Sequence, residues 1–220
     1  MTAEYALFDE HAGMSQYFEI HPTHPQNRLI QQAVRLIEDG AVIVYPTDSC
    51  YAFGCDMDNK QGMERIRRIR QADQHHHFTL VCRDLSEIAA YAKVDNSLYR
   101  LLRNHTPGPY TFILSATSEV PRRLQNPKKK TIGIRVPDHP VALALLEALN
   151  QPLMSSTLIM PGDEHPLNDP LEIREKLEKQ VDLIIDSGNC GFEPTTVIGF
   201  DNDQPQLLRQ GRGPVDWLEQ

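Results

Sequence analysis

The sequence has few cysteines, few aromatic residues and no long apolar run. Its 220 residues include 4 cysteines, which lack both the C-x-x-C spacing of a zinc knuckle and the density of a secreted disulfide scaffold. No stretch approaches the ~18–20 consecutive apolar residues of a transmembrane helix, and no basic segment followed by an apolar one opens the chain. We therefore expect a soluble, cytoplasmic protein with reduced, buried thiols and without a membrane partner.

Two nucleotide-binding motifs are also missing. The chain contains neither the Gly-x-Gly-x-x-Gly of a dinucleotide-binding fold nor the Gly-x-x-x-x-Gly-Lys-Ser/Thr of a P-loop. The consecutive His75, His76 and His77 point in different directions on a strand or loop, and they lack carboxylate or thiolate partners. No metal site is predicted.

Basic residues are in the minority. The chain has 22 Lys and Arg against 30 Asp and Glu, a formal net charge of −8, which argues against a generally basic nucleic-acid-binding protein. The cations nevertheless gather in three segments, at 65–70, 122–130 and 209–212. Each segment fits either a solvated surface or a contact for phosphates, and the sequence leaves both interpretations open.

The chain reads as one domain preceded by a short leader. Residues 1–13 end immediately before Met14, contain no Lys or Arg and show no sustained periodicity, so we expect an artificial leader or a flexible arm. Over residues 14–220, helical and strand patterns alternate without an internal repeat or a linker. This alternation predicts a single α/β domain.

The stretch 41–55 organises the rest of the chain. Its first five residues are apolar and suit a buried strand, Pro46 should end that strand, and short polar residues then form a turn before a second apolar run. This pattern places the hydroxyl groups of Thr47 and Ser49 at the rim of a sheet. Turn chemistry alone favours a polar hairpin corner without a function of its own.

The spacing of the strand pairs predicts the type of sheet. The strands within 41–55 and within 195–209 lie too close in sequence for the crossover connection that a parallel pair needs. We therefore predict a twisted, mixed and largely antiparallel sheet with flanking helices.

Five short motifs resemble those of one protein family. In chain order they are 40–55 with Pro-Thr-Asp-Ser at its centre, Pro-Gly-Pro-x-Thr at 107–111, and the segments 131–140, 194–200 and 207–211. Their order and coverage resemble the YrdC/YciO family of YrdC-like domains, with the YciO branch as the closest. The resemblance implies an α/β fold with a concave, basic surface that contains a nucleotide pocket.

The resemblance also implies an activity and its site. Family members of the YrdC type make threonylcarbamoyl-adenylate from threonine, bicarbonate and ATP, the first step toward a modified adenosine in tRNA. Carried over to this chain, the substrate-binding residues are Thr47, Ser49, Arg70, Arg135, Thr157 and Thr195. The nucleotide-binding residues are Thr111, Ser155 and Arg209. ATP, with Mg²⁺, is the candidate cofactor, and no catalytic residue is assigned.

RNA is the expected macromolecular partner, either tRNA or double-stranded RNA. The expected contacts are cations of the first two basic segments, namely Arg65, Arg67, Arg68, Arg122, Arg123, Lys128, Lys129 and Lys130. Aromatic residues make up only 7% of the chain and are spread through apolar runs, so few aromatic rings are available for stacking with bases. We therefore expect electrostatic, shape-directed binding.

Two motifs depart from the synthase pattern. Arg70-Gln71-Ala72 stands where the synthases carry Lys-x-Arg, and Thr157-Leu158-Ile159 stands where they carry Ser-x-Asn. Losing one charge-assisted contact to a developing charge typically costs about 2–4 kcal/mol, a hundredfold or more in rate. The favoured hypothesis is therefore a nucleotide- and RNA-binding protein with weak or lost synthase activity. The alternatives are an active threonylcarbamoyl-adenylate synthase and an interaction module for another ligand.

Overall fold

The computed structural model describes residues 13–73 and 76–219 of the chain. The predicted leader lies outside the described residues except for Gly13, and so does His75 of the histidine run. Within the two described ranges, no helix is both long enough and apolar enough to cross a membrane.

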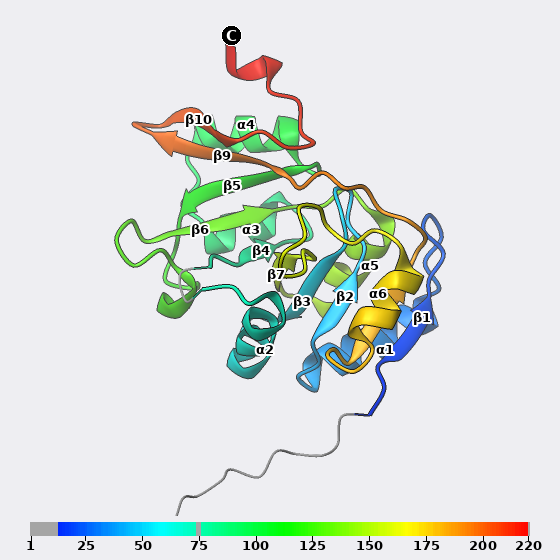
Figure 1. The fold of residues 1–220 in the computed structure, drawn as a ribbon. Coiled ribbons are helices and arrows are strands. Elements are labelled where there is room, and N and C mark those ends of the chain that lie inside the picture. Colours follow the sequence, from blue (N-terminus) through cyan, green and yellow to red (C-terminus); the bar gives the residue numbers. More distant parts are fainter. Residues whose placement is uncertain (1–12, 74–75, 220) are drawn as a thin grey trace, which may run out of the picture.

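Strands and helices alternate along the described chain (Figure 1). The strands are β1 (Gln16–Glu19), β2 (Ile43–Tyr45), β3 (Ala52–Asp56), β4 (Thr79–Val81), β5 (Tyr110–Ser115), β6 (Thr131–Arg135), β7 (Leu153–Thr157), β8 (Leu183–Asp186), β9 (Thr196–Asp201) and β10 (Gln204–Arg209). The α-helices are α1 (Asn27–Glu38), α2 (Lys60–Arg70), α3 (Leu85–Tyr91), α4 (Asn96–His105), α5 (Pro140–Leu149) and α6 (Pro170–Leu177). Two short 3₁₀ helices are η1 (Arg122–Leu124) and η2 (Asp216–Glu219).

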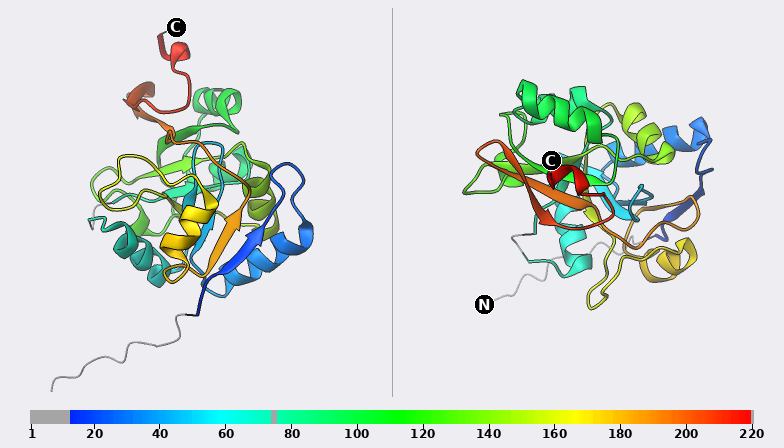
Figure 2. Two further views of the ribbon diagram at one scale, coloured as in Figure 1. Left: turned by 45° about the vertical axis from the view of Figure 1, so that its right-hand side comes forward. Right: turned by 90° about the horizontal axis from the view of Figure 1, so that it is seen from above.

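The strands form a single 10-stranded sheet in the order β1-β8-β2-β3-β7-β4-β6-β5-β9-β10. Of the nine neighbouring pairs among the described residues, five are antiparallel and four are parallel. The predicted mixed sheet in a single α/β domain is therefore confirmed, with a small antiparallel majority. The sheet twists along its length, and the β9–β10 hairpin lies at the opposite end from β1 (Figures 1 and 2).

The stretch 41–55 forms the predicted strand, corner and second strand. β2 and β3 pair antiparallel, with Val44 opposite Phe53. Because successive side chains of a strand point to opposite faces, Ile43 joins a hydrophobic cluster with α1 and α5, whereas Val44 joins a second cluster with α2 and α6. Figure 1 shows α2 and α6 in front of this part of the sheet and α1 and α5 behind it.

Aspartates cap the N-termini of three of the helices. The carboxylates of Asp84, Asp95 and Asp169 accept hydrogen bonds from backbone N–H groups in the first turns of α3, α4 and α6, at 2.8, 2.8 and 2.9 Å. Each bond satisfies a donor that the helix itself leaves unpaired.

Small residues lie side by side near the middle of the sheet. In the register, Thr79 of β4 pairs with Gly133 of β6 on one side and with Ser155 of β7 on the other. A Cβ atom on Gly133 would reach the Thr111 methyl group at 3.4 Å. Because these side chains are missing or short, little protein stands above this part of the sheet, which forms a low floor for a cavity. Glycine in the middle of a strand is typical of a close approach by another group.

Candidate ligand-binding site

A cavity of about 460 Å³ lies over this low floor. Its lining includes every residue that the sequence assigned to small-molecule binding, namely Thr47, Ser49, Arg70, Thr111, Arg135, Ser155, Thr157, Thr195 and Arg209. These residues come from segments spread between positions 47 and 209, and the sheet brings them together.

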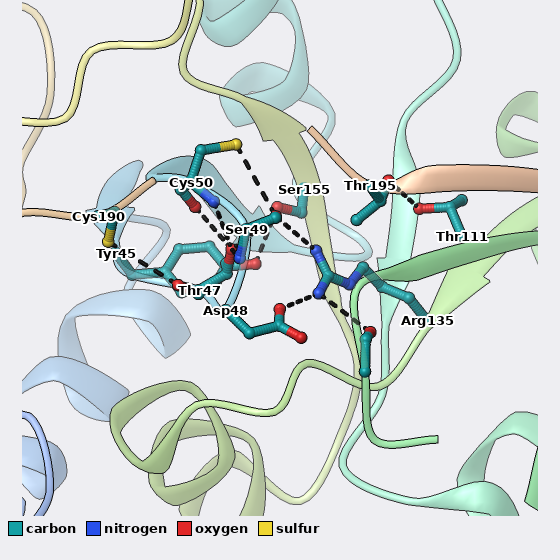
Figure 3. A network of polar contacts seen from close by, with 11 residues as sticks. Tyr45, Thr47, Asp48, Ser49, Cys50, Thr111, Arg135, Ser155, Cys190 and Thr195 are labelled. Atoms are coloured by element: carbon teal, nitrogen blue, oxygen red, sulfur yellow. Dashed lines mark hydrogen bonds and ion pairs between the residues drawn. The ribbon is translucent and has the colours of Figure 1, made fainter. Parts of the chain in front are cut away.

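The corner between β2 and β3 is held by the Thr47 hydroxyl group. Thr47 Oγ1 donates to the Cys50 carbonyl oxygen at 2.6 Å and accepts from the backbone N–H groups of Ser49 and Cys50, each at 3.2 Å. It also lies 3.1 Å from Ser49 Oγ (Figure 3). A hydroxyl group with this many partners within its own turn fixes the backbone of the corner and so orients Ser49.

Arg135, at the end of β6, points into the same corner. Its Nη1 donates to Ser49 Oγ at 3.2 Å, and its Nη2 donates to the Asp48 carboxylate and, at 3.4 Å, to the Gly108 carbonyl oxygen (Figure 3). The side chains of Arg135 and Asp48 are only 7% and 10% exposed, so this is a buried ion pair. A buried guanidinium requires such a partner because an isolated charge is strongly disfavoured away from water.

Asp48 has a part in the site that the sequence reasoning did not assign. The signal was available in the Pro-Thr-Asp-Ser motif, because a carboxylate in a buried corner calls for a cation. The pairing with Arg135 depends on a contact 87 positions away, and no periodicity predicts that contact.

Two threonines meet where β5 pairs with the start of β9. Thr111 Oγ1 and Thr195 Oγ1 are 2.8 Å apart, and both side chains are buried. The Thr195 carbonyl oxygen accepts from Arg209 Nη2 at 2.9 Å, which holds the Arg209 side chain at the edge of the cavity. Partial burial lowers the pKa of Arg209 from its usual value, but an arginine remains charged.

A second cluster surrounds Arg70, at the end of α2. Arg70 Nη1 donates to Ser156 Oγ and, at 2.9 Å, to His76 Nε2, and the latter two atoms are 2.9 Å apart. Burial, followed by the charges of Arg70 and Arg67, lowers the pKa of His76 to about 4. The ring is therefore neutral at pH 7 and accepts the arginine's hydrogen bond. Sequence reasoning missed the parts of His76 and Ser156, although each stands in a run of residues that it had noted.

Comparisons with known proteins bear on the identity of the chain. The model of the Sua5/YciO/YrdC family, described as telomere recombination, matches residues 35–211. The chain belongs to the Sua5/YciO/YrdC family. It is 58% identical to YciO of Escherichia coli strain K12 over 202 residues, which cover 92% of this chain and 98% of that protein. The crystal structure of E. coli YciO has a TM-score of 0.88 over the same shares of the two chains. The resemblance to the YciO branch is confirmed.

More distant members of the Sua5/YciO/YrdC family include named enzymes. The chain is 29% identical to threonylcarbamoyl-AMP synthase of Vibrio vulnificus strain YJ016 over 185 residues, which cover 83% of this chain and 98% of the enzyme. The crystal structure of P. abyssi Sua5 complexed with L-threonine has a TM-score of 0.84 at 22% identity, over 93% of this chain and 60% of that one. The protein is therefore a YrdC-like domain related to threonylcarbamoyl-AMP synthase.

The two departures from the family's synthase pattern both lie at the cavity. Arg70, Thr157 and Ile159 line it, whereas Ala72 is not part of its lining. Thr157 keeps a hydroxyl group, whereas Ile159 presents only hydrocarbon.

The cations that the sequence assigned to RNA binding do not all lie together. Lys129 lines the main cavity, and Arg67, Arg122 and Arg123 line a second cavity of about 240 Å³. Arg65 lines neither; its guanidinium donates to the Gln180 carbonyl oxygen at 2.8 Å and to the Asp182 carboxylate at 2.7 Å. The remaining three, Arg68, Lys128 and Lys130, are exposed and line neither cavity.

Carboxylates are absent from the described lining of both cavities, although the chain carries a net charge of −8. In the part of the chain that the structure describes, no group of three or more His, Cys, Asp or Glu side chains is placed to hold a metal ion.

Proposed function

We propose that the protein binds a nucleotide, with ATP as the first candidate, in the main cavity. RNA phosphates bind along the adjoining basic rim, formed by Arg67, Arg122, Arg123 and Lys129. Synthesis of threonylcarbamoyl-adenylate is weak or absent. The observation that carries the proposal is the positive charge of the cavity: Arg70, Lys129 and Arg209 line it, and no Asp or Glu does among the described residues. A hollow lined by one sign of charge raises the local concentration of the opposite ion.

The arginines suit different parts of a nucleotide-dependent site. The Arg209 side chain makes one hydrogen bond within the described part of the chain, to a carbonyl oxygen, so its other donors are available for phosphate oxygens. Thr111 and Thr195 beside it supply hydroxyl donors. Arg135 is already neutralised by Asp48, so it serves to hold Ser49 in place at the corner between β2 and β3.

Weak synthase activity follows from the residues on the cavity wall. Adenylation requires reactants that are held in line and a cation or amide placed where charge develops. Arg70 is tied to Ser156 and His76, and Ile159 offers no polar atom where the synthases carry an amide. The pocket can therefore bind a nucleotide without supplying every contact that the reaction needs.

The lining does not fit a resident Mg²⁺ ion. Magnesium sites in nucleotide-binding proteins use one or two carboxylates together with substrate phosphates. No carboxylate lines the described part of the cavity. Any magnesium would therefore arrive with the nucleotide, and no step of the proposal depends on it.

Calorimetric titration with ATP tests the nucleotide site. We expect weak binding to the parent protein, about tenfold or more weaker binding to Arg209→Ala because charge-assisted hydrogen bonds are lost, and parent-like binding to Arg100→Ala. Arg100 is the matched control, since it lies exposed on α4 and lines neither cavity. Absence of ATP binding to the parent, or equal affinities of the parent and Arg209→Ala, would overturn the proposal.

An active synthase is the alternative, favoured by the 29% identity to a threonylcarbamoyl-AMP synthase. Pyrophosphate release from ATP that requires both threonine and bicarbonate, at a rate similar to that of a family synthase measured in parallel, would establish this alternative.

A further inference from the structure

The two cavities adjoin each other. His76, His77, Phe78 and Leu124 line both of them, so one wall of the main cavity is also a wall of the second. The second cavity measures about 240 Å³ and lies between α2 and the segment that contains η1. A ligand long enough to cross this wall would contact both cavities.

We infer that the second cavity binds the next phosphate of a single-stranded RNA end whose terminal nucleotide occupies the main cavity. This inference rests on the proposed nucleotide binding and names the larger ligand to which that nucleotide belongs.

The charges of the second cavity support this assignment. Arg67, Arg122 and Arg123 line it, and no carboxylate does within the described residues. The Arg122 guanidinium makes no hydrogen bond or ion pair with any described residue, so all its donors are open to a ligand. Arg123 is anchored by the Met57 carbonyl oxygen at 2.9 Å and lies 3.6 Å from Asp58.

Arg67 is held in position at the opposite side. Its guanidinium carbon lies 5.2 Å from the centre of the Phe78 ring, and one of its terminal nitrogens pairs with Glu64. Its Nε is buried and has no hydrogen-bond partner among the described residues. A buried donor without a partner is costly, and a phosphate oxygen would satisfy it.

The shape of the site favours a single strand over a duplex. A duplex presents its phosphates on a convex outer surface, whereas a single strand can splay its nucleotides into separate hollows. The shared wall carries the exposed imidazole of His77 and the half-buried imidazole of His76, which are suitable surfaces for stacking a base, whereas the Phe78 ring is buried. A free nucleotide with several phosphates on one side is the competing source of the same chemistry.

The test compares three small probes. AMP has one phosphate, ADP has two phosphates on the same side of the ribose, and adenosine 3′,5′-bisphosphate has its two phosphates on opposite sides. We expect the bisphosphate to bind the parent protein about tenfold more tightly than AMP, as one additional charge-assisted phosphate contact would give. In Arg122→Ala this ratio should fall to about one, and in Arg100→Ala it should stay at the parent value.

Each outcome decides between the proposals. Equal affinities of AMP and the bisphosphate in the parent, or an unchanged ratio in Arg122→Ala, would overturn the inference while AMP binding leaves the nucleotide site standing. If no probe binds, the nucleotide site and the inference both fail. If Arg122→Ala lowers the affinity for ADP relative to AMP as much as it lowers the affinity for the bisphosphate relative to AMP, the ligand is a free polyphosphate nucleotide. The assignment of an RNA end is then wrong.

A last arm uses RNA itself. A short single-stranded oligoadenylate should bind more tightly than a duplex of the same length, and Arg122→Ala should remove the difference. Tighter binding of the duplex would overturn the inference and leave RNA contacts on the outer surface only.

Discussion

Two regions of the adjoining cavities differ in how their arginines are paired. In the Asp48 corner (Thr47, Asp48, Ser49 and Arg135), the guanidinium is buried and paired with a carboxylate. In the basic rim (Arg67, Arg122, Arg123 and Lys129), no carboxylate lines the described cavity wall. The difference separates two uses of one residue type. The corner's arginine is held by a buried carboxylate, whereas Arg67 and Arg123 pair, among the described residues, only with the exposed carboxylates of Glu64 and Asp58 and keep donors for a ligand.

The comparison implies different costs for losing each region. Breaking a buried ion pair leaves one charge without a partner and without water, which typically costs about 3–5 kcal/mol. Removing an exposed cation that has no partner changes stability by less than about 0.5 kcal/mol. Variants in the corner should therefore act on unfolding, and variants in the rim should act on binding.

The largest expected effect is from Asp48→Asn. The substitution removes the charge opposite Arg135 and should lower the free energy of unfolding by about 3–5 kcal/mol, measured by urea denaturation. Asp138→Asn is the matched control, because Asp138 is an exposed carboxylate near the same end of β6. If Asp48→Asn were as stable as Asp138→Asn, the corner would not be the structural element that the burial indicates.

The sequence was informative about the corner's residues and less so about their pairing. Pro46 and the polar residues after it predicted the turn, and the family motifs singled out Ser49 and Arg135, which prove to be in contact. Asp48 was overlooked, although the motif offered a carboxylate that needs a cation, because nothing local identifies that cation as Arg135 of β6. The single α/β domain and the mixed sheet were predictable from hairpin spacing, but the strand order depends on long-range pairing.

The basic rim was harder to predict. Charge clusters in the sequence predicted Arg65 and Arg67 together, although they lie on one helix at positions that point differently. Arg65 reaches Asp182, whereas Arg67 reaches Phe78 and the second cavity. Helical geometry separates side chains two positions apart, and only the packing of α2 decides which of them faces the cavity.

The next effect tests the cavity wall between the two regions. Restoring the synthase motifs with Arg70→Lys, Ala72→Arg, Thr157→Ser and Ile159→Asn together should raise threonine-dependent adenylate formation by about a hundredfold, because one positioned charge-assisted contact contributes about that much. Adding Arg209→Ala to the four substitutions is the control and should remove the gain. A folded quadruple variant that is no more active than the parent would mean that the deficiency lies elsewhere.

A smaller effect is expected from Lys129 of the rim and the two lysines beside it. Changing Lys128 and Lys129 to Ala and Lys130 to Asn should weaken RNA binding about tenfold at low salt. Asn is chosen because residue 130 has a φ of 52°, which Asn tolerates better than Ala. The slope of log affinity against log salt should shrink by about 0.9 for each lost duplex contact, or about 0.7 on a single strand.

The control for the lysine variant removes three cations elsewhere. Lys93, Arg100 and Arg103 are exposed and lie on or just before α4, away from both cavity linings. Changing these three to Ala alters the net charge equally. Equal losses of RNA affinity in the two triple variants would mean that only the total charge of the protein matters and that the basic rim is not a specific RNA contact.

His76 gives the smallest effect and links the two regions. The His76 ring lies between Arg70 and Ser156. The nearby charges of Arg67 and His77 oppose protonation of the ring, whereas the charge of Asp73 favours it. Burial and the two arginines lower its pKa to about 4, below the usual value of 6.5. The unfolded chain therefore binds a proton between about pH 6.5 and pH 4 that the folded chain does not, so the folded state loses stability as the pH falls through this range.

We expect the parent protein to lose about 1 kcal/mol more stability than His76→Gln between about pH 7 and pH 5, after allowance for solvent screening of a partly exposed ring. Gln retains a side-chain oxygen that can accept the Arg70 hydrogen bond but does not titrate, so the difference between the two proteins isolates the ring's protonation. Urea midpoints measured at both pH values provide the comparison, with the exposed His165→Gln as a control that should follow the parent. Adding ATP should reduce the loss at low pH, because a phosphate beside Arg70 favours the protonated ring. Identical pH profiles of the parent and His76→Gln would mean that the imidazole titrates as in water, and the Arg70 cluster would then be open to solvent rather than part of the cavity wall.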